Sequence, residues 1–126
     1  MDKNCNNDLL MKDSGSGFLE LTSSSRYDNN MDCFLVLTAP PNQRMLVRLL
    51  KLNLHSGLDP CSDWMQLFDG GSPLDTELTG HLCGDTIPGE SYASTGQTIT
   101  VVFTSDHADN DGGFMLLFTT FSMGNL

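Results

Sequence analysis

Four cysteines and three histidines are the residues of this chain whose types and spacing could do chemistry. An even number of cysteines in a short acidic chain is typical of a disulfide framework in an extracellular protein. Four cysteines allow three pairings, and we favour the sequential one, because each loop then closes within its own half of the chain. That pairing joins Cys5 to Cys33 and Cys61 to Cys83. A four-cysteine zinc site is disfavoured, since no Cys-x-x-Cys pair occurs.

The three histidines, His55, His81 and His107, form no recognisable catalytic pattern. Ser56 and Asp59 lie near His55, but a hydrolytic site needs a nucleophile, a base and an orienting group that meet in space. Neither a Gly-x-Ser-x-Gly nor a His-Glu-x-x-His motif occurs. We therefore interpret the histidines as solvated loop residues and expect no enzymatic activity.

The charge of the chain is divided unevenly along its length. Residues 1–51 hold all six Lys and Arg residues and six acids, whereas residues 52–126 hold ten acids and carry the whole net charge of −10. Nucleic acid and anionic membranes are poor partners for such a surface, and basic proteins or a bound cation are better ones. For the scattered acids, solubility alone is the alternative. No apolar run is long enough to insert in a membrane. No signal peptide is recognisable at residues 1–5, so we interpret the chain as a mature protein or an excised domain.

The elements that must position these residues are short strands. Alternating apolar residues, separated by turns rich in Gly, Pro and Asn, predict strands at residues 17–22, 33–38, 45–54, 64–68, 77–83, 91–94, 98–104 and 114–121. A regular alternation over residues 45–54 places Met45, Val47, Leu49 and Lys51 on one side and Leu46, Arg48, Leu50, Leu52 and Leu54 on the other. Both sides are too apolar for a plain surface strand. A helix is the alternative, but the neighbouring strands favour a strand here too.

Many short strands with frequent turns and no helical stretch predict an all-β fold. We expect an antiparallel β-sandwich, jelly-roll-like and with two disulfides. The sandwich is expected to form a single domain over residues 15–122. Residues 1–14 are expected to be a poorly ordered lead-in that is held only at Cys5, and residues 123–126 a tail.

Several segments, taken in order, resemble the CUB domain, an extracellular β-sandwich module. They are the turn and core strand at 39–41 and 45–49, Cys61 to Gly70 (Cys-Ser-Asp-Trp-Met-Gln-Leu-Phe-Asp-Gly), Leu82-Cys83-Gly84, Val102 to Asp106 (Val-Phe-Thr-Ser-Asp) and Gly113-Phe114. The resemblance covers most of residues 15–121 and also implies the sequential disulfides. The first half departs from the pattern. The usual Ser-Pro-x-Tyr-Pro segment is replaced by residues 23–28, and Leu35 stands where the family usually has Trp.

The resemblance also implies a calcium site. Many CUB domains hold Ca²⁺ at one end of the sandwich with a Glu and two Asp side chains. Asp63 and Asp106 match the two aspartates, and Tyr27 falls where the family often has a Tyr beside the site. His55 stands at the Glu position, and imidazole is a poor ligand for a hard cation.

The same loops hold other oxygen donors for such an ion. Asp59, Asp109 or Asp111 are candidates for the missing oxygens, while Ala108 replaces a Ser that often follows the second Asp. In the alternative interpretation, the matched aspartates cap turns and bond to loop backbone. A transition-metal site between the histidines at positions 55 and 107 is a remoter alternative.

The function that follows from these patterns is protein recognition on the loops of a β scaffold. We expect a secreted protein or the extracellular part of a cell-surface protein. Its partner is expected to offer Lys or Arg to acidic, calcium-ordered loops, with Tyr27, His55 and Asp109 as further contact residues. The alternatives are a spermadhesin-like binder of carbohydrate, which the acidic second half disfavours for sulfated sugars, and a structural module that self-associates.

Overall fold

The computed structural model describes Met1 and residues 5–22, 26–55, 61–85, 87–106 and 112–122. The described residues form nine strands and no helix: β1 Asn7–Leu10, β2 Ser16–Glu20, β3 Asp32–Thr38, β4 Gln43–Asn53, β5 Trp64–Asp69, β6 Thr76–Glu77, β7 Ser91–Ala93, β8 Thr98–Thr104 and β9 Gly113–Ser122. Within these residues no helix is long and apolar enough to span a bilayer. The prediction of an all-β fold is confirmed.

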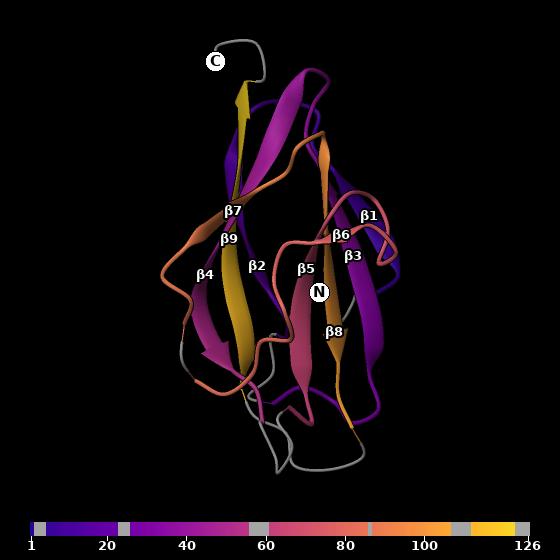
Figure 1. The fold of residues 1–126 in the computed structure, drawn as a ribbon, viewed down its shortest axis with the longest axis vertical. Coiled ribbons are helices and arrows are strands. Elements are labelled where there is room, and N and C mark those ends of the chain that lie inside the picture. The colour runs from indigo at the N-terminus through magenta and orange to yellow at the C-terminus, as the bar shows by residue number, and fades with distance from the viewer. Residues whose placement is uncertain (2–4, 23–25, 56–60, 86, 107–111, 123–126) are drawn as a thin grey trace.

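The strands form two sheets that pack face to face. One sheet has the order β1-β3-β8-β5-β6 and the other the order β2-β9-β4-β7. Every pairing between these strands is antiparallel except β1 with β3, which is parallel. The two sheets stand side by side in Figure 1, with β4, β9 and β2 in one layer and β5, β8 and β3 in the other. This is the β-sandwich that the strand pattern predicts.

The core lies between the sheets and is built by alternating residues of the longest strands. In β8, Ile99, Val101 and Phe103 are fully buried. The facing positions of the other sheet include Val47 and Leu116, which are also fully buried. Side chains on one face of a strand recur every second residue, so the β-branched run of β8 places one apolar set in the core.

A β-bulge in β4 explains why both sides of residues 45–54 look apolar. The pairing of β4 with β9 shifts between Leu49 and Lys51, so that Leu50 is the extra residue. Before the bulge Leu49 faces the core, and after it Leu52 does so, with 2% and 5% of their surfaces exposed. The bulge therefore turns Lys51 outward, and the regular alternation expected from the sequence was wrong beyond Leu49.

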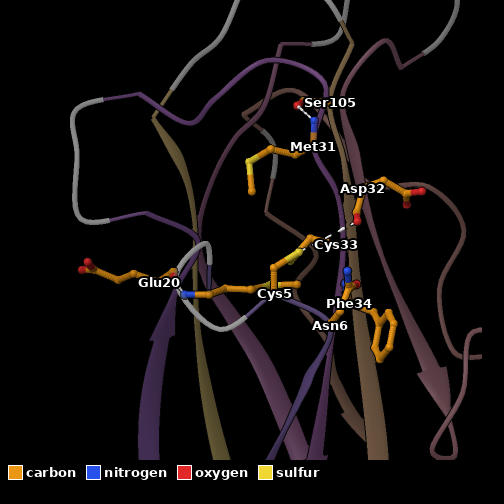
Figure 2. The surroundings of a disulfide bond; sticks show 9 residues. Cys5, Asn6, Glu20, Met31, Asp32, Cys33, Phe34 and Ser105 are labelled. Atoms are coloured by element: carbon orange, nitrogen blue, oxygen red, sulfur yellow. Dashed lines mark hydrogen bonds between the residues drawn. A yellow bond between two sulfur atoms is a disulfide. The ribbon is translucent and has the colours of Figure 1, made fainter.

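The first strand lies in the segment that was expected to be a poorly ordered lead-in. Residues Asn7–Leu10 pair in parallel with residues 35–38 of β3. The disulfide between Cys5 and Cys33 joins the two chain segments just before this pairing begins. Figure 2 shows Cys5 beside Cys33, with Asn6 next to Phe34. The N–H of Asn6 donates to the Phe34 carbonyl at 2.7 Å, which continues the attachment.

The second disulfide, between Cys61 and Cys83, confirms the sequential pairing. Cys83 is the last residue of a strand that the sequence predicts over residues 77–83. Only Thr76–Glu77 form a strand there, although Met65 and Leu82 form an isolated bridge. Between them the Thr79 hydroxyl accepts the N–H of Leu67 at 3.2 Å. A side-chain hydrogen bond therefore replaces a rung of the ladder, which explains why the strand is short.

Candidate functional site

Four connections meet at one end of the sandwich and bring together the residues singled out in the sequence. Tyr27 lies between β2 and β3, His55 follows β4, Asp63 precedes β5 and Asp106 follows β8. The strand register explains the meeting: Thr104 of β8 pairs with both Asp32 of β3 and Trp64 of β5. The residues just beyond these three positions therefore lie close together, although they are far apart in the sequence.

Asp63 is the centre of this arrangement. Its side chain is fully buried. Oδ2 of Asp63 accepts a hydrogen bond from the Tyr27 hydroxyl at 2.5 Å, and Oδ1 accepts one from the backbone N–H of Asp106 at 2.8 Å. The N–H of Asp63 donates to the His55 carbonyl at 3.1 Å. A buried carboxylate must be hydrogen-bonded to be tolerated, and here both of its oxygens are.

Tyr27 links the buried carboxylate to His55 and to the core. Its hydroxyl accepts the backbone N–H of His55 at 3.0 Å while donating to Asp63. Its ring packs edge-on against Phe103, with 5.0 Å between the ring centroids and 73° between the planes. Only 2% of Tyr27 is exposed. The phenol is therefore held firmly enough to orient the carboxylate.

Ser105 is a structural member of this site that the sequence analysis did not single out. Its hydroxyl donates to the Asp28 carbonyl at 2.7 Å and accepts the N–H of Met31 at 2.9 Å. Figure 2 shows this second bond. The N–H of Asn30 also donates to the carbonyl of Asp106 at 2.7 Å. These bonds fasten the end of β8 to the connection before β3, which gives the Ser of the Ser-Asp motif a physical role.

The electrostatics of the site are set by burial and by the proximity of two carboxyl groups. Burial raises the pKa of Asp63 above its ordinary value of 3.8, and the Asp106 side chain raises it further. The hydrogen bonds from Tyr27 and from the Asp106 backbone oppose this rise in pKa. Two neighbouring carboxylates repel each other when both are ionised, and a divalent cation between them would remove the repulsion.

The donor set fits calcium in kind but is incomplete in the described part of the chain. Asp63 and Asp106 are hard oxygen donors, and each Asp63 oxygen accepts one hydrogen bond from the described residues, which leaves lone pairs for a cation. His55 offers nitrogen where the family pattern has Glu. Among the described residues no group of three or more His, Cys, Asp or Glu is arranged to hold a metal ion. Of the candidate donors, Asp59, Asp109 and Asp111 lie outside the described residues, as do His107 and Ala108.

His81 lies apart from this arrangement. Its exposed imidazole stacks on the indole of Trp64, with 3.7 Å between the ring centroids and 4° between the planes. His55, in contrast, takes part in the site through its backbone N–H and carbonyl. Ser56, the nearest hydroxyl in sequence to His55, lies outside the described residues.

Comparison with known proteins decides the family. A family model described as a CUB domain matches residues 5–118. The chain belongs to the CUB domain family. This CUB domain is 34% identical to cubilin of Sus scrofa over 104 residues. The matched region is 80% of this chain and 3% of cubilin. It is 25% identical to a cubilin homolog of Caenorhabditis elegans over 118 residues. That match is 89% of this chain and 3% of the homolog. The chain thus spans only a small part of the length of these relatives.

Solved structures agree on the fold of this CUB domain. The MASP-1 CUB2 domain bound to Ca²⁺ matches with a TM-score of 0.73 at 16% identity, covering 91% of this chain and 98% of that one. The extracellular region of zebrafish Gpr126/Adgrg6 matches with a TM-score of 0.74 at 23% identity, covering 94% of this chain and 15% of that one. CUB domains are non-catalytic modules of secreted proteins and receptor ectodomains, where they generally mediate protein interactions. The prediction of an extracellular CUB domain is therefore confirmed.

Proposed function

We propose that this CUB domain binds a protein partner through basic side chains, at the end of the sandwich where Asp63 and Asp106 lie, and that it has no catalytic activity. The observation that carries this proposal is the pairing of a buried acid with a half-buried one. Asp63 is fixed by Tyr27 and by the backbone of Asp106, while Asp106 itself is partly exposed. An ordered carboxylate at the surface is well suited to accept a Lys or Arg side chain.

Calcium is the ion that we propose to order this end, with Asp63 and Asp106 as its carboxylate ligands and Asp109 as a further contact residue. When bound, the ion would supply positive charge that neutralises the two carboxylates. His55 leaves one carboxylate fewer than the family pattern provides. We therefore expect weaker binding than in a CUB domain with the full set, because affinity for Ca²⁺ rises with the charge of the ligands.

Calorimetric titration of Ca²⁺ into metal-stripped protein tests the calcium proposal, paired with melting curves in calcium and in chelator. We expect saturable heat and a raised melting temperature. His55→Glu should tighten binding by about tenfold, since it restores the third carboxylate, whereas His81→Glu adds the same charge elsewhere and should not. Absence of heat from both the native chain and the His55→Glu variant would refute the calcium site. Heat from the variant alone would mean that the native chain recognises its partner without calcium.

Recognition of basic side chains is tested separately with two peptides that differ at one position. One peptide has Lys there and the other has norleucine, which lacks the charge. We expect the Lys peptide to bind and Asp106→Ala to weaken it by about tenfold, because a charge-assisted contact is lost. Asp8→Ala removes an exposed acid from β1 and serves as the matched control. An unchanged affinity in Asp106→Ala would exclude this loop. Retention on heparin at physiological salt would instead favour the carbohydrate-binding alternative.

A further inference from the structure

A second surface, distinct from the acidic end, lies on the outer face of the sheet β2-β9-β4-β7. Side chains that point away from the core form two adjacent rows across three strands. Phe18, Leu117 and Arg48 stand opposite one another in the first row, and Glu20, Met115 and Lys51 do so in the second. Along β9 the face is therefore apolar, and along β4 it is cationic.

The apolar part of this face is unusually open to solvent. Phe18 exposes 66% of its surface, although its inward neighbour Leu19 is buried. Leu117 and Met115, beside it on β9, are partly exposed. An exposed aromatic residue beside other apolar side chains marks an interaction surface more often than a lone exposed residue does.

A hollow of about 460 Å³ opens beside the second row. Glu20 stands on its β2 side and Lys51 on its β4 side, with Met115 between them and Ile87 also lining it. Gly112 and Gly113 contribute only backbone to its lining. The hollow is large enough for one or two aliphatic side chains of a partner.

The charges on β4 decide what kind of partner fits. Arg48 and Lys51 are exposed, and within the described residues neither lies within ion-pair distance of a carboxylate. Half of the cations of residues 1–51 lie on this single strand, in a chain whose net charge is −10. Lys51 faces outward only because the bulge after Leu49 turns it away from the core. The β4 side of this face is thus a cationic strip on an otherwise acidic molecule.

We propose that this face binds an extended segment of a partner protein in which an aliphatic residue is flanked by Asp or Glu. The aliphatic side chain enters the hollow over Met115. The flanking acidic side chains pair with Arg48 and Lys51, and the rest of the segment contacts Phe18 and Leu117. Apolar contact supplies the affinity, and the cationic strip selects acidic over basic segments. This surface lies on the outer face of the sheet, whereas the acidic end that we propose for basic partners is formed by the connections beyond the strand ends.

Selection from a random peptide library displayed on phage tests this proposal, followed by fluorescence anisotropy with the enriched peptides. We expect enriched sequences to combine aliphatic and acidic residues. Arg48→Glu and Lys51→Glu should each weaken binding by at least about fivefold, because each replaces an attraction with a repulsion. Lys12→Glu reverses an exposed charge outside this face and is the matched control.

The apolar contribution is tested in the same assay with Phe18→Ser. Leu10→Ser is its control, since Leu10 on β1 is 65% exposed and Phe18 is 66% exposed. Binding of the enriched acidic peptides should survive Asp106→Ala, which separates this proposal from the one above. Enrichment of basic peptides, no enrichment at all, or affinities unchanged by Arg48→Glu and Lys51→Glu would overturn it. Self-association in sedimentation that these two variants abolish would assign the face to a second copy of the chain and also overturn it.

Discussion

The hydroxyl of Tyr27 is the atom whose removal tests the account of the acidic end most directly. Tyr27→Phe keeps the ring against Phe103 but deletes the donor to Asp63 and the acceptor of the His55 N–H. A hydrogen bond to a charged group contributes about 1.5–3 kcal/mol, and a neutral one about 1 kcal/mol. We therefore expect the free energy of unfolding to fall by about 3 kcal/mol.

This loss converts to a change in melting temperature. An unfolding entropy of about 2.1 cal/mol/K per residue is about 0.26 kcal/mol/K for a chain of this length, so the expected fall is about 11 °C. Differential scanning calorimetry in chelator measures it without interference from calcium. Tyr92→Phe is the control, because the Tyr92 hydroxyl makes no hydrogen bond within the described part of the chain.

The effect of Tyr27→Phe should also depend on pH. The pKa of Asp63 is raised in the folded protein, so its contribution to stability is fully present below the unfolded value near 3.8 and is lost as the pH rises through the folded value. The Tyr27 bond lowers the pKa of Asp63, so its loss raises that pKa further. The deficit should therefore be larger at about pH 7 than at about pH 3.5. A melting temperature within about 2 °C of the native protein, or an equal deficit at both pH values, would refute this reasoning.

Two further predictions concern other parts of the fold. Gly113→Ala should destabilise the domain by about 1–3 kcal/mol in urea unfolding, because its φ of +98° disfavours a side chain and the new Cβ would lie 3.2 Å from the Leu21 Cβ. Gly80→Ala, with open space around it, should be neutral, and equal effects of the two changes would contradict this. The pKa of Tyr92 is raised by burial and by Glu90, so its phenol should titrate above 10.0 in NMR. Glu90→Gln should lower that pKa, and an unchanged titration would exclude the charge as a cause.

The strands and the disulfides were largely predictable from the sequence for local reasons. The run of β-branched residues in β8 specifies a strand in any sandwich, and its predicted bounds, Thr98–Thr104, are those observed. The turn residues between strands predicted most of the remaining boundaries to within two residues, the end of β6 excepted. The sequential pairing of cysteines, which we favoured because each loop closes within its own half of the chain, is the one observed.

Two features of the fold escaped prediction because they depend on a second strand. Asn7–Leu10 have no strong alternation and become a strand only through pairing with β3. The bulge in β4 arises from its register with β9, which one strand's pattern cannot specify. The helix alternative for this segment arose from the same cause, because an unrecognised bulge makes both faces look apolar.

The sequence by itself determined the class of fold, because strand and turn signals are local, and it favoured the sequential disulfides. The candidate calcium residues came from the resemblance to CUB domains. Only the tertiary structure decided how those residues act. It buries Asp63 and leaves Asp106 half-exposed, because the register of β3, β5 and β8 brings the connections next to these strands together. It also turns Lys51 to the outer face beside Phe18 and Met115, where cross-strand pairing joins residues that are far apart in the chain. Burial and cross-strand neighbours are properties of the packed sheets, so no single segment of the sequence encodes them.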